Sequence, residues 1–200
     1  MALMAQQTYH EHEEDPLIAT NRQFGHLLER INHLPQAVLT ILEGTIMGGG
    51  FGLACVSDIA LAHHQARFRL PETSLGLPPA QIAPFMVDRI GLTHARRLAV
   101  TGGEINSNEA LRLNLVHELY SDEEELEHKV KKLFHELERC GPQATAKTKK
   151  LVLSASRNER NLLLEQAASD FAQAVRSTEG IEGMQAFAQK RRAAWNQGMG

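Results

Sequence analysis

The sequence predicts an α/β fold over its first 120 residues and an all-helical region after them. Three short apolar runs are too short for helices and suit strands. They span residues 37–42, 59–62 and 66–70. A glycine cluster at 48–50 follows the first run and leads into a short apolar segment ending at Val56, which is typical of a turn from a strand into a buried helix. After Ser121 the apolar residues repeat at helical spacing, so strands are expected only in the first part.

The first run is rich in Val, Leu, Thr and Ile without polar alternation, which predicts a strand buried on both faces. A capping box of Thr20 and Gln23 predicts a preceding helix that begins at Thr20 and ends before Pro35. The prolines at 78, 79 and 84 predict a loop that feeds a short helix to Gly91, with helix continuing over 92–100.

Further along, Asn106 stands three residues before Glu109 and predicts a capped helix over 106–113, followed by a brief strand at 116–120. Ser121 with Glu124 predicts another capped start. Two stripes of apolar residues then predict helices. These stripes are Leu126, Val130, Leu133, Phe134 and Leu137, and Leu164, Ala167, Ala168, Phe171 and Val175.

These patterns divide the chain into a mobile lead-in at 1–19, an α/β core at 20–120 and a helical oligomerisation region at 121–200. The acidic run from His10 to Asp15 has no apolar frame, so we interpret it as solvated chain rather than as a metal cluster. No metal site is expected elsewhere.

Composition excludes several classes of partner and site. A net charge of −3 with mixed signs leaves no basic face for nucleic acid or an anionic membrane. The two cysteines, Cys55 and Cys140, stand far apart, which argues against zinc and disulfides and fits a reducing compartment. No apolar stretch approaches the length of a spanning helix, and the first residues lack a signal pattern. We therefore expect a cytoplasmic protein.

Two features carry candidate chemistry. The glycine cluster matches neither phosphate-binding glycine motif, yet a glycine turn leaves N–H groups free at the start of the next helix. By itself such a turn serves a ligand or tight packing equally well. Glu72 follows Pro71 at the end of a predicted strand in an apolar neighbourhood, where a carboxylate can act as general acid or base. Without the glycine turn, an ordinary loop glutamate would be the better interpretation.

Together these motifs resemble the signature of the crotonase (enoyl-CoA hydratase) superfamily. The resemblance covers nearly everything from residue 20 onward and rests on short motifs in a fixed order. These are Gly48-Gly49-Gly50, Asp58, Ile59 to Ala62, Pro71-Glu72, Leu75-Gly76-Leu77-Pro78, Thr101-Gly102-Gly103, Asn108 to Leu111, Leu115-Val116, Glu182-Gly183, Ala186-Phe187 and Lys190-Arg191. The family implies a ββα spiral followed by helices that pack subunits into a homotrimer or hexamer. It also implies acyl-CoA thioester substrates, with no cofactor beyond the CoA that the substrate carries.

By matching positions, the resemblance implies that Gly49 supplies one backbone N–H of the oxyanion hole. Glu72 then corresponds to the second of the two glutamates that hydratases use, while the position of the first is Gly52. With Gly48 and Gly50, Gly52 completes the expected substrate-binding loop. Lys190 and Arg191 are candidates for contact with the CoA of a neighbouring subunit, although a solvated basic helix end is the more favoured interpretation, because cations are stabilised at helix carboxy-termini in any case.

The glycine at 52 and the run Pro79 to Phe85 are similar to hydratases that act on isohexenylglutaconyl-CoA in acyclic terpenoid breakdown. We therefore expect a lyase that adds water across the double bond of a branched enoyl-CoA. One glutamate is also similar to the double-bond isomerases of the superfamily. Met1 is expected to fall after the family's amino-terminal segment, which donates the other oxyanion N–H. The core at 20–120 would then be partial, and a non-catalytic subunit is the third hypothesis.

Overall fold

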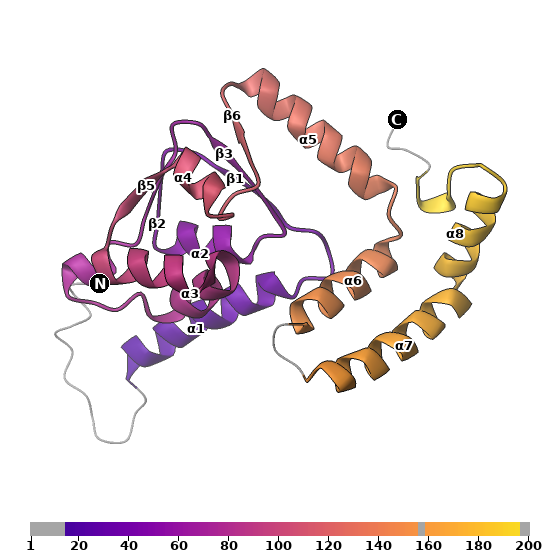
Figure 1. Ribbon diagram of the computed structural model, residues 1–200, viewed down its shortest axis with the longest axis horizontal. Helices are drawn as coiled ribbons and strands as arrows, with labels where there is room; N and C mark the ends of the chain where they lie inside the picture. Colours follow the sequence, from indigo (N-terminus) through magenta and orange to yellow (C-terminus); the bar gives the residue numbers. More distant parts are fainter. Residues whose placement is uncertain (1–14, 156–158, 197–200) are drawn as a thin grey trace. The chain divides into compact units, whose positions relative to one another are not determined.

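The computed structural model describes residues 15–155 and 159–196, which form two units (Figure 1). Residues 15–32 and 38–121 make the first unit, and residues 33–37 with 122–155 and 159–196 make the second. Most of the acidic run that begins at His10 lies outside the described residues.

The first unit contains two small sheets. One has the order β1-β3-β6, all parallel, and the other has the order β2-β4-β5, with β2 and β4 parallel and β5 antiparallel to β4. The strands are β1 (Leu39–Leu42), β2 (Thr45–Met47), β3 (Ile59–His63), β4 (Arg67–Arg69), β5 (Glu104–Asn106) and β6 (Glu118–Tyr120). Each strand of the first β-β-helix turn pairs with its counterpart in the second turn. The chain therefore winds as the expected ββα spiral.

Helices cover these sheets. The helices of the first unit are α1 (Pro16–Asn32), α2 (Gly49–Val56), α3 (Ala83–Thr101) and α4 (Ser107–Arg112), with 3₁₀ turns η2 (Glu72–Leu75) and η3 (Ala80–Ile82). Figure 1 shows α2 lying between the strands and α1. Helix α2 also packs against α3. Its Phe51 and Ala54 are fully buried with Leu28 of α1 and Phe68 of β4. This arrangement encloses α2 and fixes the position of its first turn.

The second unit is entirely helical. It contains α5 (Glu123–Glu138), α6 (Pro142–Ser154), α7 (Arg160–Arg176), α8 (Thr178–Ala188) and the 3₁₀ turn η4 (Ala194–Asn196). Glu179 of α8 accepts hydrogen bonds from the N–H groups of Gln143 (2.9 Å) and Ala144 (2.8 Å), which caps α6 from another helix. Many large apolar side chains of this unit are exposed. They include Phe134, Val152, Leu162, Leu164, Phe171, Met184 and Phe187.

The first helix begins earlier than the sequence predicted. It starts at Pro16, and Asp15 accepts a 2.7 Å hydrogen bond from the N–H of Leu17, so Thr20 and Gln23 are interior positions and not a capping box. Proline is favoured at the first helical position because its missing N–H would be unpaired there. Residues 16–19 are therefore helical rather than part of a lead-in.

Other boundaries also differ from the predictions. Strand β1 is not buried on both faces, since Ile41 is 46% exposed at the edge of its sheet. Strands β2 and β5, of three residues each, were missed because so short a run carries little pattern. The cap of α5 is Asp122, which accepts from the N–H of Glu125, and not Ser121. The predicted cap of α4 is confirmed, because Asn106 accepts from the N–H of Glu109 at 2.9 Å.

Candidate active site

The site begins at the turn from β2 into α2. Gly48 has φ 49° and ψ −117°, a conformation that a residue with a Cβ adopts only with strain. The first backbone bond of α2 runs from the N–H of Gly52 to the carbonyl of Gly48 at 3.0 Å. The N–H groups of Gly49 and Gly50 precede this bond, and no side chain caps the helix. The first turn of α2 therefore has backbone N–H groups of the kind that can bind an anionic group.

Glu72 approaches the same turn from the end of β4. Strands β2 and β4 are parallel and in register, with Met47 opposite Arg69, so their carboxyl ends lie side by side. Gly48 follows one strand and Glu72 follows the other. The Oε1 atom of Glu72 lies 3.9 Å from where a Cβ on Gly48 would be. The sheet register thus brings together two residues that stand 24 positions apart.

The carboxylate of Glu72 has an unusual environment. Its Oε2 atom is buried and has no hydrogen-bond partner among the described residues. Buried polar atoms are nearly always bonded, so an unpartnered carboxylate oxygen marks a place where a ligand or water is expected. The carboxylate of Glu72, which approaches Gly48 at the start of α2 through Oε1, is the best candidate for the reactive group.

Apolar side chains surround the other glycines. A Cβ on Gly52 would lie 3.0 Å from Cδ1 of Leu28 and 3.5 Å from Cγ1 of Ile82. A Cβ on Gly49 would lie 3.7 Å from the ring of Phe24. The position where the resemblance places a first glutamate is therefore filled by the packing of α1 and η3 against α2. Sequence reasoning missed Phe24 and Ile82 because an apolar residue on a helix is typical of core.

Lys190 and Arg191 belong to the second unit, whereas Glu72 belongs to the first. The guanidinium of Arg191 donates to both oxygens of Glu182, at 2.6 and 2.9 Å. Those bonds, with a third from the N–H of Ala194, lower the pKa of Glu182 to about 2. Arg191 is thus engaged within its own unit, and Lys190 follows the carboxy-terminal cap of α8 with φ 54°.

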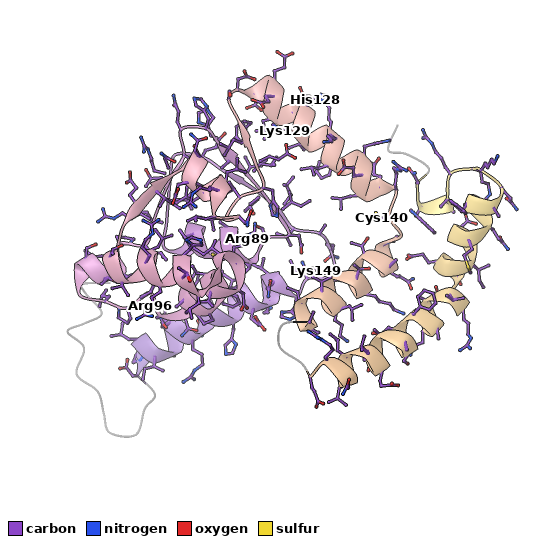
Figure 2. The ribbon with its side chains drawn as sticks, in the orientation of Figure 1. Arg89, Arg96, His128, Lys129, Cys140 and Lys149 are labelled. Carbon is purple, nitrogen blue, oxygen red and sulfur yellow. The ribbon has the colours of Figure 1, made fainter. Side chains whose placement is uncertain are left out.

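Arg89 is a further polar group that the sequence did not single out. It lies on α3, is labelled in Figure 2, and donates to the carbonyls of Ser57 (3.0 Å) and Leu115 (3.0 and 3.1 Å). Burial lowers the pKa of Arg89 and raises the pKa of the nearby Cys55 thiol to about 12. The thiol therefore stays protonated, and the arginine joins the end of α2 to the loop before β6.

A ββα spiral with backbone donors at a helix start, beside a carboxylate that has one buried oxygen, is typical of a class of enzyme that polarises a carbonyl and moves a proton. The family profile described as enoyl-CoA hydratase/isomerase matches residues 4–198. The chain therefore belongs to the enoyl-CoA hydratase/isomerase family and is a hydratase-like enzyme of acyl-CoA chemistry.

Known proteins agree with this assignment. A crystal structure of an enoyl-CoA hydratase/isomerase from Marinobacter aquaeolei is 46% identical with a TM-score of 0.94, covering 98% of this chain and 75% of that one. The structure of Pseudomonas aeruginosa AtuE is 50% identical with a TM-score of 0.90, covering 92% and 72%. A Bacillus subtilis protein named "Probable enoyl-CoA hydratase" is 33% identical over 90% of this chain and 69% of its own length.

Proposed function

We propose that the chain adds water across the α,β double bond of an enoyl-CoA thioester, with Glu72 as the only carboxylate that moves protons. The observation that carries this proposal is the Glu72 carboxylate, whose Oε2 atom is buried with no partner among the described residues and whose Oε1 atom lies 3.9 Å from where a Cβ on Gly48 would be. The N–H of Gly49 would polarise the thioester carbonyl, because addition at the β-carbon places negative charge on that oxygen.

The steps follow from these two groups. Glu72 takes a proton from water as the water oxygen bonds to the β-carbon, and the electron pair of the double bond moves onto the thioester oxygen. The enolate then collapses and takes the proton from Glu72 at the α-carbon. Gly48, Gly50 and Gly52 would line the substrate at this turn, with Leu28 and Ile82 supplying apolar surface beside Gly52. One carboxylate therefore suffices for both proton transfers.

A double-bond isomerase is the second candidate, favoured by the same single carboxylate. In that reaction Glu72 would remove a proton from one carbon and return it to another without adding water. A subunit that binds CoA thioesters without turnover is the third. For the acyl group we propose a branched chain of the isohexenylglutaconyl type, which rests on the sequence resemblance at Gly52 and Pro79 to Phe85. No cofactor is proposed beyond the CoA of the substrate.

To test the proposal, the purified chain is incubated with crotonyl-CoA or with a 3-branched glutaconyl-CoA, and the products are identified by mass spectrometry. Hydration adds the mass of one water, whereas isomerisation leaves the mass unchanged and moves the double bond. Products with added water support the hydratase. A shifted double bond alone would support the isomerase, and binding without turnover would support the non-catalytic subunit.

We also propose that the second unit assembles the protein into a homotrimer or hexamer in the cytoplasm. Phe171 is 71% exposed and Phe187 is 88% exposed, and such large exposed apolar side chains mark association surfaces. Lys190 and Arg191 would lie near the CoA of a neighbouring subunit in such an assembly. Light scattering at micromolar concentration tests this, and a monomer would contradict it.

A further inference from the structure

The turn that carries Glu72 is held by polar contacts rather than by packing. Thr73, Ser74, Leu75 and Gly76 are all exposed, and Leu75 has 69% of its surface in solvent. Within the turn, the N–H of Ser74 bonds to the carbonyl of Pro71 at 2.9 Å and the N–H of Leu77 bonds to the carbonyl of Glu72 at 2.9 Å. An exposed 3₁₀ turn of this length needs outside contacts to keep one position.

Arg69 supplies one of those contacts. It is the last residue of β4, and its Nε donates to the carbonyl of Gly102 at 3.0 Å while its Nη2 donates to Oγ of Ser74 at 3.2 Å. Oγ of Ser74 donates in turn to the carbonyl of Pro71 at 2.8 Å. The guanidinium thus joins the residues on both sides of Glu72 to the carboxyl end of α3, where a cation is favoured.

Thr73 and Gly102 complete the attachment. Oγ1 of Thr73 donates to the carbonyl of Ala99 at 2.5 Å, and that carbonyl belongs to the last turn of α3, where no intrahelical partner is available. Gly102 has φ 60°, and a Cβ there would lie 2.9 Å from Oγ of Ser74. The turn therefore rests directly on the end of α3 with no room for a larger residue.

The carboxylate depends on this attachment because Oε2 makes no hydrogen bond of its own to the described residues. Its position at Gly48 is set by the backbone of the turn. Resting on the proposed role of Glu72, we propose that Arg69, acting with Thr73 and Ser74, is a positioning residue that holds Glu72 at the start of α2. A misplacement of about 1 Å in such a group costs on the order of 100-fold in rate.

The experiment compares Arg69→Met with Arg67→Met, a matched control on the same strand. Arg67 has an exposed side chain, and its 4.0 Å ion pair is with Glu104 of β5 rather than with a residue of the turn. We expect Arg69→Met to lower kcat by roughly 10- to 100-fold with KM within threefold, and Arg67→Met to leave both within threefold. Thr73→Val should also lower kcat, and Thr73→Ser should restore it. Equal losses in the two arginine variants, or no loss in Arg69→Met, would overturn the proposal.

A double variant separates positioning from general stability. If Arg69 acts through Glu72, then Arg69→Met should change the residual rate less than threefold in a Glu72→Gln background, because residues that act as a unit are not additive. The same large factor in both backgrounds would refute this role. Full activity of Glu72→Gln alone would instead refute the proposed function, so the two failures are distinct.

A measurement that needs no substrate tests independently whether Arg69 holds the turn. Hydrogen exchange of the peptide spanning 70–77 should be faster in Arg69→Met than in the parent by at least about threefold, since the turn then opens more often. Arg67→Met should match the parent. Identical exchange in all three proteins would show that Arg69 does not hold the turn.

Discussion

Replacing Glu72 by Gln should remove activity while leaving the protein about as stable as the parent. Gln keeps the shape of Glu but takes no proton from water, so kcat should fall by about 10²- to 10⁴-fold. Most substitutions destabilise a protein, so a loss of activity without a loss of stability would point to a catalytic role.

The stability part follows from the environment of the carboxylate. Its Oε2 atom is buried without a partner among the described residues, and a buried polar oxygen left unbonded costs about 1–3 kcal/mol, more when charged. Gln has the same shape and also leaves a polar atom unbonded there, so we expect the free energy of unfolding to change by no more than about 1 kcal/mol. In a chain of this size that keeps Tm within roughly 2–4 °C of the parent value.

The assay pairs steady-state hydration of an enoyl-CoA thioester with thermal unfolding at pH 7. Glu104→Gln is the control, because that side chain lies exposed on β5 and should change neither quantity. An active Glu72→Gln variant would refute the catalytic assignment. A variant whose Tm falls by several degrees would show that Oε2 has a stabilising partner, and the argument from an unpartnered oxygen would then be wrong.

Two further predictions concern stability. His117 accepts a 2.9 Å hydrogen bond at Nδ1 from the N–H of Ala60, and burial, then the charge of Arg89, lowers the pKa of His117 below 6.5. The unfolded chain therefore binds more protons just below pH 6.5, so stability should fall as pH drops through that value, and His117→Gln should flatten the dependence measured by urea unfolding. Gly180→Ala should lower Tm strongly, because its Cβ would lie 2.0 Å from the carbonyl oxygen of Ala174, whereas Gln185→Ala at an exposed position of the same helix should not.

Local signals in the sequence were sufficient for much of the fold. Asn106 with Glu109 predicted a helix cap that the structure contains, and the runs at 59–62 and 66–70 became β3 and β4. These succeed because caps and strand runs depend on residues a few positions apart. The start at Ser121 failed because Asp122 with Glu125 satisfies the same pattern one residue later. The start at Thr20 failed because the helix already begins at Pro16, and the motif falls inside it.

The sequence by itself also determined the residue types of the site, a glycine turn and a glutamate after a proline. It did not determine that they meet. The register of β2 with β4 brings Glu72 to Gly48, and the packing of Leu28 and Ile82 fills the space beside Gly52. The bonds from Arg69 and Thr73 to the end of α3 likewise join residues about 30 positions apart. Such contacts depend on which strands pair and which helices pack, and only the tertiary structure decides that.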